Sequence, residues 1–172
     1  LDKKVIVKKL SSIQNLGEVN LLCTDKTGTI TEGNIKISGL IDGFGTESEF
    51  IKQLAYWNAN FETGYSNPID DSIRQLTLDS KFTAKKIGEI PYDFIRKRLS
   101  IAIHTDTKNL LISKGAFIQI LSICTKIRLM DGNEESITAH KQELEKKFEK
   151  FGTDGLRAIG ICYKNIAQQK KE

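Results

Sequence analysis

The sequence predicts an α+β fold, with α/β character at its start, in which helices flank a mainly antiparallel sheet. Three observations support this prediction. After Lys85 the hydrophobic residues recur with a period of two, as in strands that bury one face. Elsewhere, apolar residues recur at helical spacing behind capping residues. The chain has 172 residues, of which 39% are hydrophobic, so it can bury a core without disulfide bonds.

The first part of the chain predicts short strands joined by loops. Residues 1–10 alternate Lys with Val and Ile, which suits a short strand or an extended arm. Residues 19–23 form a short, mostly apolar run that leads directly to Asp25, so they predict a buried strand with Cys23 as a small core residue. Glycines punctuate residues 33–45, where one more strand and a connection are expected.

Two helices are predicted from the residues that begin them. Thr46 and Glu49 have the spacing of a capping box, and the apolar repeat that follows predicts a helix over residues 47–58. Asn67 is a good helix cap and Pro68 suits the first helical position, so a second helix is expected to begin there.

Hairpins dominate the prediction for the second half. Apolar residues alternate over residues 87–103, and a second apolar segment, residues 110–112, follows after a turn. This pattern predicts a hairpin. Asp131-Gly132 predicts another, between residues 127–129 and 136–137. Two more helices and a last strand are expected over residues 116–124, 138–151 and 156–163.

Composition excludes several classes of protein. The net charge is +4, with Lys scattered among Glu and Asp, which indicates a solvated surface and no nucleic-acid partner. No apolar run approaches the roughly 20 residues of a membrane helix, so a soluble chain is expected. Three Cys without metal-ligand spacing predict buried, reduced thiols in a cytosolic setting. The first residue is Leu and no signal segment follows it, which predicts an excised piece of a larger protein.

The strongest functional signal is the loop after the predicted strand of residues 19–23. Asp25 stands at the carboxyl end of that strand, where α/β sheets place ligands. Lys26, Gly28 and neighbouring hydroxyl groups suit the binding of phosphate oxygens. An Asp in this position can act as a nucleophile and carry an aspartyl-phosphate. The simpler interpretation is that Asp25 begins an ordinary turn.

Residues 25–31, Asp-Lys-Thr-Gly-Thr-Ile-Thr, resemble the phosphorylation motif of the P-type cation-transporting ATPases. The resemblance implies that Asp25 takes the γ-phosphoryl group of ATP. It also implies that Asp25 and Thr27 bind Mg²⁺ together with residues that this chain lacks. The implied phosphate and magnesium loop consists of Lys26, Thr27, Gly28 and Thr29. The first strand would then belong to the phosphorylation domain, which has the haloacid-dehalogenase type of fold.

Later segments resemble the nucleotide-binding domain of the same family. The segment that begins the second predicted helix resembles an acidic motif of the nucleotide pocket, with Asp70 as its acid. Residues 91–100 resemble the segment that supplies an adenine-stacking aromatic residue and basic residues. The resemblance implies stacking by Tyr92, with Phe94 as the near alternative, and phosphate binding by Lys97.

Two further motifs follow in the order that the family has. Lys114-Gly115-Ala116 resembles the motif whose Lys lies deep in the nucleotide pocket, and Gly115 would let a backbone approach the ligand closely. Residues 154–157, Asp-Gly-Leu-Arg, resemble the motif whose Arg reaches the ATP phosphates, which implies that role for Arg157. Together the motifs cover nearly the whole chain.

Each of these segments also has a simpler structural interpretation. Residues 96–98 alone are typical of a solvated strand face. Tyr92 and Phe94 alone suit a core, and Lys114-Gly115 alone suits a turn at the end of a strand. Their joint order favours the nucleotide pocket.

The resemblance implies two parts of a larger enzyme. Residues 1–36 would be an incomplete, poorly packed N-terminal part of the phosphorylation domain, and residues 37–172 the nucleotide-binding domain. The implied cofactors are ATP and Mg²⁺. The implied partners are the rest of the phosphorylation domain, the actuator domain and the membrane helices of the same parent chain. The parent is expected in the bacterial plasma membrane with this piece on the cytoplasmic side, and the isolated piece is expected to bind ATP without catalysis.

Within the family, the chain most resembles the magnesium-translocating branch of bacteria, and the proton- and calcium-type branches remain alternatives. The segments that carry this resemblance are residues 5–8, 13–17, 63–64 and 91–94. Two other classes stay open. A haloacid-dehalogenase-type phosphatase generally needs a second acid two residues after the first, where this chain has Thr27. A non-catalytic interaction module would leave the joint occurrence of Tyr92, Lys114 and Arg157 unexplained.

Overall fold

The computed structural model describes residues 6–26, 28–30, 35–64, 67–77 and 83–167. The chain divides into two compact units, residues 1–34 and residues 35–172, and each is described by itself. Among the described residues, no helix has the length and apolar character needed to cross a lipid bilayer.

The described residues of the first unit include one short helix, α1 (Ser11–Gly17), and all of their side chains are exposed. The buried strand predicted over residues 19–23 is wrong. These residues form no regular structure, Leu22 is 74% exposed, and Cys23 is exposed rather than part of a core. An apolar run becomes a buried strand only where neighbouring elements cover it, and the described residues of this unit offer no such cover. Residues 6–10 form no strand either.

In the second unit, helix α2 (Glu49–Phe61) confirms the first predicted helix but begins differently. Its cap is Ser48, whose hydroxyl accepts a hydrogen bond from the Ile51 amide at 3.4 Å. Thr46, which the capping-box pattern assigned to this role, instead donates its amide to the Asp42 carboxylate at 3.0 Å. Thr46 has the Glu three residues later that a capping box needs and Ser48 does not, but both are good helix caps, and the path of the preceding loop decides between them.

Helix α3 (Pro68–Arg74) confirms the second predicted helix and its start. The Asn67 side chain accepts hydrogen bonds from the first free amides of the helix, as a cap should. The strand expected within residues 33–45 does not form over residues 35–45, the part of that segment that the structure describes. The described part of that segment has only an isolated bridge between Ile41 and Glu47.

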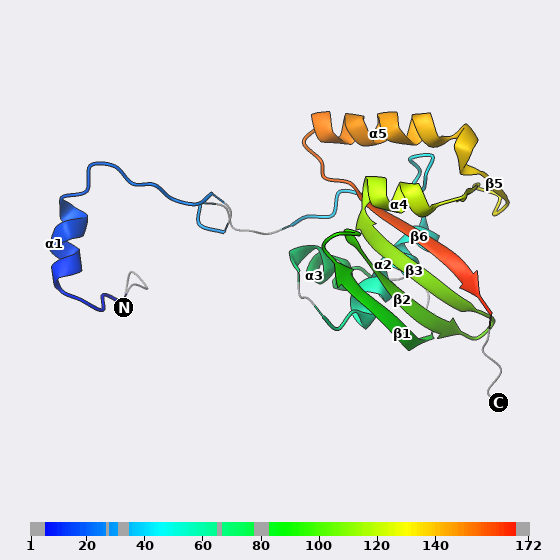
Figure 1. The fold of residues 1–172 in the computed structure, drawn as a ribbon, viewed down its shortest axis with the longest axis horizontal. Coiled ribbons are helices and arrows are strands. Elements are labelled where there is room, and N and C mark those ends of the chain that lie inside the picture. Colours follow the sequence, from blue (N-terminus) through cyan, green and yellow to red (C-terminus); the bar gives the residue numbers. More distant parts are fainter. Residues whose placement is uncertain (1–5, 27, 31–34, 65–66, 78–82, 168–172) are drawn as a thin grey trace. The chain divides into compact units, whose positions relative to one another are not determined.

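Four antiparallel strands form the main sheet in the order β1-β2-β3-β6, which confirms the predicted α+β class (Figure 1). Their bounds are β1 (Ala84–Asp93), β2 (Arg98–Thr105), β3 (Asn109–Ala116) and β6 (Ile159–Ile166). The predicted hairpin is the β2–β3 pair, and β1 extends it on one side. The last strand pairs with β3 and begins three residues later than the pattern indicated.

The remaining elements lie between β3 and β6 in the sequence. They are α4 (Phe117–Ile123), β4 (Lys126–Arg128), β5 (Glu134–Ser136), the 3-10 helix η1 (Ile137–Ala139) and α5 (Lys141–Thr153). The β4–β5 pair confirms the hairpin predicted around Asp131-Gly132. Gly132 has a φ of 89°, the left-handed conformation that favours glycine in such a turn. A small core joins these elements through Leu121, Ile127 and Leu144.

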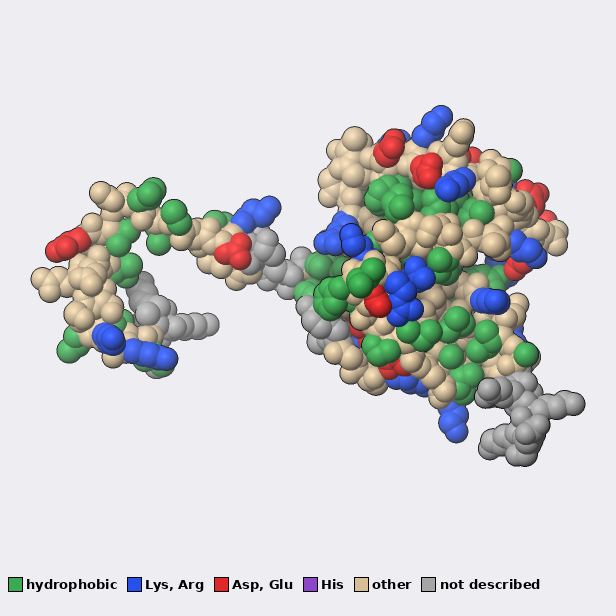
Figure 2. All heavy atoms as spheres, viewed as in Figure 1, with side chains coloured by type: hydrophobic (Ala, Val, Ile, Leu, Met, Phe, Trp, Pro, Cys, Tyr) green, Lys and Arg blue, Asp and Glu red, His purple; other side chains and the backbone are tan. Residues whose placement is uncertain are grey.

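The main core lies between α2 and the sheet. Leu54 and Trp57 of α2 pack with alternate residues of the two central strands, Leu99, Ile101, Ile103, Leu110 and Ile112. Each fully buried aliphatic side chain of this kind stabilises the fold by about 1.5–3 kcal/mol. Figure 2 shows apolar and basic side chains interspersed over the side of the second unit that faces the viewer.

Candidate functional site

Strand register brings most of the predicted nucleotide residues to one end of the sheet. Asp93 pairs with Arg98, Arg98 with Gly115, and Gly115 with Gly160. These pairs form a row across all four strands. The end of β1, the start of β2, the end of β3 and the segment before β6 therefore lie abreast. That end carries Tyr92, Phe94, Lys97, Lys114 and Gly115, and Arg157 lies just before β6.

An exposed aromatic pair marks the β1 side of this end. Tyr92 is 40% exposed and Phe94 is 79% exposed, so the simpler interpretation of these residues as core is wrong. Their rings meet edge to face, with centroids 5.2 Å apart and an interplanar angle of 82°. An accessible ring of this kind offers a face to a purine, and base–aromatic stacking contributes about 1–3 kcal/mol.

Asp93 fixes the turn that follows the aromatic pair. Its carboxylate accepts hydrogen bonds from the amides of Ile95 and Arg96, both at 2.8 Å, and from the Arg96 guanidinium at 3.1 Å. The Arg96 amide is the main cause that lowers the pKa of Asp93 below its usual range. The basic residues 96–97 therefore lie in a tight turn, and only Arg98 belongs to a strand.

Gly115 is required by the backbone that lies against it. A Cβ atom at this position would lie 2.3 Å from the carbonyl oxygen of Lys97 and 2.6 Å from the Cβ of Arg98. Lys97 adopts a φ of 49°, and its carbonyl accepts a hydrogen bond from the Ala116 amide at 2.9 Å. The backbone that approaches Gly115 closely is therefore that of Lys97 and Arg98 in the same chain. This contact fixes the position of the Lys97 backbone, from which its side chain extends.

Lys114 forms the buried centre of the site. It is 7% exposed and makes an ion pair with Asp70, which is fully buried at the start of α3. The interpretation of Lys114 as a strand-end turn residue is wrong, because it lies within β3 and pairs with Leu99. Asn67 donates to the second carboxylate oxygen of Asp70 while it caps α3. The cap thus connects the helix start to the buried lysine.

Glu62 completes this cluster, although no sequence pattern predicts it there. It is the cap at the end of α2, its side chain is 4% exposed, and its Oε2 lies 3.6 Å from the Nζ of Lys114. No motif includes Glu62. The signal in the sequence is a single carboxylate at the end of an apolar helix, which is ordinarily solvent-exposed.

The pKa values of the two carboxyl groups in the cluster shift in opposite directions. Burial, together with the neighbouring Asp70, raises the pKa of Glu62 to about 7, although Lys114 opposes this rise. Burial also opposes ionisation of Asp70, but hydrogen bonds from protonated Glu62 and from Lys114 hold the Asp70 pKa below its usual value. Near neutral pH the cluster therefore holds one carboxylate, one ammonium and one partly protonated carboxyl group.

The Asp25 loop belongs to the first unit and is described apart from this cluster. Asp25 is exposed, and Gly28 has a φ of 80°, which explains a glycine at that position. The Ile30 amide donates to the Lys26 carbonyl at 3.0 Å, so the loop is a tight turn. Thr29 is exposed there, and Thr27 lies outside the described residues.

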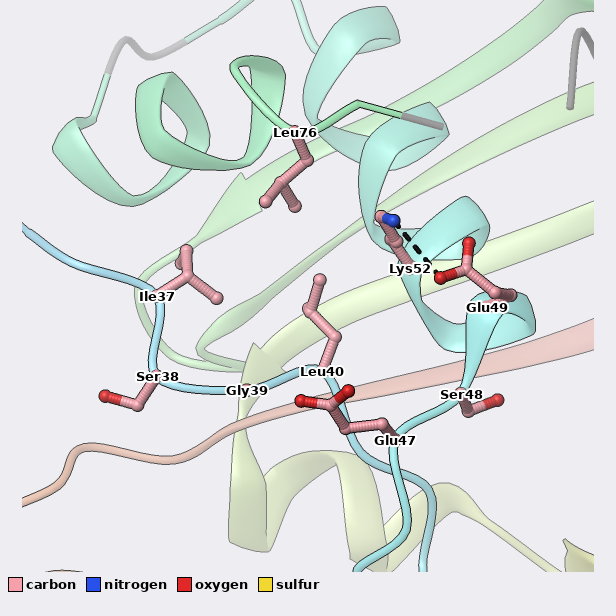
Figure 3. Close-up of a pocket in the computed structure, with 9 residues that line it drawn as sticks. All are labelled: Ile37, Ser38, Gly39, Leu40, Glu47, Ser48, Glu49, Lys52 and Leu76. Carbon is pink, nitrogen blue, oxygen red and sulfur yellow. Dashed lines mark hydrogen bonds and ion pairs between the residues drawn. The ribbon is translucent and has the colours of Figure 1, made fainter. Parts of the chain in front are cut away.

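A cavity of about 230 Å³ lies elsewhere in the second unit (Figure 3). Its apolar lining comes from Ile37, Leu40 and Leu76, and its polar lining includes an ion pair of 3.1 Å between Lys52 and Glu49. None of the predicted nucleotide residues lines this cavity. We therefore locate the candidate site by the polar and aromatic residues at the sheet end rather than by this cavity.

Comparisons with known proteins identify the family of this chain. The sequence profile of the P-type ATPase cytoplasmic domain N matches residues 12–172. The profile match thus places most of this chain in cytoplasmic domain N of that family. The chain belongs to the P-type ATPase family, which confirms the resemblance drawn from its motifs.

Relatives in bacteria are similar over most of this chain. It is 39% identical over 171 residues to the magnesium-transporting ATPase, P-type 1 of Salmonella typhimurium strain 14028s. It is 33% identical over 173 residues to the protein of the same name in Escherichia coli K12. In each case 95% of this chain but only 19% of the relative is covered. The calcium-transporting ATPase 1 of Schizosaccharomyces pombe is 24% identical over 198 residues, covering 93% of this chain and 22% of that protein.

Proposed function

We propose that this chain is the ATP-binding part of a P-type ATPase that couples ATP hydrolysis to cation transport, with Mg²⁺ as the transported ion. The observation that carries the proposal is the buried Lys114–Asp70 ion pair at the same sheet end as the exposed ring of Tyr92. Lys114 suits the anionic phosphates of a nucleotide, and the Tyr92 ring suits its base. The greater identity to magnesium-transporting relatives than to a calcium-transporting one favours Mg²⁺ over the calcium-type alternative.

In this proposal each side chain of the sheet end has one task. Tyr92 stacks on the adenine, and the Phe94 ring contacts the Tyr92 ring nearly at a right angle. Lys97, Lys114 and Arg157 supply positive charge to the phosphates, and Asp70 orients Lys114 through the ion pair. Gly115 lets β2 lie close to β3, which fixes the position of the Lys97 backbone.

The chemical step is proposed for Asp25. A carboxylate oxygen of Asp25 attacks the γ-phosphorus of ATP, the bond from that phosphorus to the β–γ bridging oxygen breaks, and ADP leaves. Lys26, Gly28 and Thr29 belong to the loop that would hold the phosphoryl group.

Carboxylate and hydroxyl oxygens are the ligands that Mg²⁺ prefers, which fits Asp25 and Thr27 as two of its ligands. Among the described residues, no group of three or more metal-binding side chains lies together. We therefore propose that further ligands come from the rest of the phosphorylation domain. The isolated chain should bind ATP but hydrolyse none at a measurable rate.

The wider setting is proposed from the same family membership. Residues 1–36 would contribute to the phosphorylation domain and residues 37–172 would form the nucleotide-binding domain. The actuator domain and the membrane helices of the parent chain would be the partners. The parent would lie in the bacterial plasma membrane with these residues on its cytoplasmic side.

An ATP titration of the labelled 172-residue chain, followed by backbone amide NMR, tests the binding step. Shifts should gather at Tyr92, Asp70, Lys114 and Arg157. The variant Tyr92→Ala should bind ATP roughly 5- to 150-fold more weakly, which corresponds to the loss of about 1–3 kcal/mol of stacking, and Tyr92→Phe should bind normally.

Ile95→Ala is the matched control, because Ile95 is 91% exposed in the same turn. If Phe94→Ala weakens binding and Tyr92→Ala does not, the stacking residue is Phe94. If millimolar ATP shifts none of these amides, the proposed binding site is wrong.

A further inference from the structure

Glu62 is buried in a way that its position in the sequence does not require. It caps the end of α2, where a carboxylate would ordinarily reach solvent, yet its side chain is 4% exposed. Its Oε2 makes no hydrogen bond to the described residues, and the Nζ of Lys114 lies 3.6 Å away. An ionised carboxylate oxygen in this position would be poorly solvated.

Charge balance explains how the protein tolerates the group. Lys114 carries one positive charge, and Asp70 already balances it through a direct ion pair. A proton on Glu62 leaves the cluster neutral and lets the Glu62 carboxyl donate to Asp70. Loss of that proton leaves one uncompensated negative charge beside the ammonium group, which burial disfavours. The pKa of about 7 for Glu62 agrees with this geometry.

The charges that act on Glu62 come from two neighbouring elements. Asp70 belongs to α3 and Lys114 belongs to β3. The strand β1 carries a further ion pair, Lys86 with Glu89, which hydrogen-bonds to Thr63 beside Glu62. Because these two groups neutralise each other, the Asp70–Lys114 pair dominates the field at Glu62.

We propose that Glu62 is a positioning residue of the nucleotide site, which holds Lys114 and carries a proton whose loss weakens nucleotide binding. This inference rests on the proposed function. A nucleotide is anionic, and its phosphates need the positive charge of Lys114. Neutral Glu62 leaves that charge to Asp70 and the nucleotide, whereas ionised Glu62 competes for it and repels the phosphates.

The sign of the pH dependence follows from this competition. A nucleotide that prefers neutral Glu62 raises the pKa of Glu62 when it binds, so binding takes up a fraction of a proton from water near neutral pH. Affinity should be nearly constant well below pH 7 and should fall above it, by at most about tenfold per pH unit for one proton.

The experiment measures ATP binding to the 172-residue chain by calorimetry from mildly acidic to mildly alkaline pH. It compares the wild type with Glu62→Gln, which mimics the neutral carboxyl group. The control is Glu89→Gln, which removes a nearby carboxylate that pairs with Lys86 rather than Lys114. ATP itself titrates in this range, but it does so equally with all three proteins.

Wild type and Glu89→Gln should lose affinity with rising pH more steeply than Glu62→Gln, and all should agree at the acidic end. Titration heats in two buffers of different ionisation enthalpy should show greater proton uptake by the wild type. Equal pH profiles for wild type and Glu62→Gln would overturn the role of Glu62 and leave the proposed function intact. Absence of ATP binding at every pH would overturn both.

A second measurement needs neither ATP nor a variant. Carbon-13 NMR of the side-chain carboxyl groups should find that Glu62 titrates near neutral pH while Asp70 titrates far below. If Glu62 instead titrates in the range of an exposed glutamate, the inference is wrong even where Glu62→Gln fails to fold.

Discussion

The loop around Asp25 and the sheet end around Lys114 carry motifs of similar clarity but differ in physical state. Every described side chain of the first unit is exposed, and its apolar run at residues 19–23 forms no strand. In the second unit, Lys114 and Asp70 are buried and paired with each other. A motif therefore identifies the chemistry of a site, whereas packing decides whether the site is already assembled.

The reason for the difference lies in the source of the partners. Lys114 finds its carboxylates on α2 and α3, which belong to the same unit. In the first unit, Leu21 and Leu22 expose about three-quarters of their surface, and the described residues of that unit do not cover them. We therefore expect substitutions in the two regions to have very different effects on stability.

The largest effect is expected for Lys114→Met. This change removes the positive charge that contacts both Asp70 and Glu62. Their buried carboxyl groups then lose the ammonium group that balances their negative charge. Breaking a buried pair in this way costs about 3–5 kcal/mol. Urea unfolding should find that loss at alkaline pH and a smaller loss at acidic pH, where the carboxyl groups become neutral.

The control for this prediction is Lys97→Met, because Lys97 is exposed in the β1–β2 turn. A surface change of this kind should alter stability by less than about 0.5 kcal/mol. Equal unfolding midpoints for Lys114→Met and wild type would mean that the ion pair does not hold the sheet end together.

An intermediate effect is expected for Gly115→Ala. The added Cβ would lie 2.3 Å from the Lys97 carbonyl oxygen, and backbone on both strands must move to admit it. Overpacking of this kind costs about 1–3 kcal/mol. Gly88→Ala is a matched control in the same sheet, because its Cβ would meet only the Ala102 side chain at 3.7 Å.

The two glycine variants distinguish a local clash from a general intolerance of alanine. In thermal unfolding, Gly115→Ala should have a clearly lower midpoint temperature than Gly88→Ala. The same order should appear in ATP affinity, since Lys97 would be displaced only in the first variant. Similar behaviour of the two variants would argue against the close approach at Gly115.

The smallest effect is expected for Leu22→Ser in the first unit. Its side chain is 74% exposed, so its replacement should change the free energy of unfolding by less than about 0.5 kcal/mol. For comparison in the second unit, Leu54→Ala removes most of a fully buried side chain at a cost of about 2–5 kcal/mol. A large loss for Leu22→Ser, measured by urea unfolding, would contradict the contrast between the two units.

Much of the second unit could be predicted from local signals. Asn67 and Pro68 begin α3 as their side chains dictate, and Asp131-Gly132 closes a hairpin. These features depend on residues close together in the sequence, so their physics is visible there. The cap of α2 is an instructive failure, because Thr46 and Ser48 are both suitable acceptors and only the loop path selects Ser48.

By itself, the sequence determined the fold class, the start of α3, the hairpins and the family to which the chain belongs. Tertiary structure alone decided that residues 19–23 stay uncovered and that Glu62 joins Lys114 and Asp70. Burial and charge pairing are properties of neighbours in space. Glu62 and Lys114 are far apart along the chain, so neither carries a local sign of the contact that shifts the pKa of Glu62.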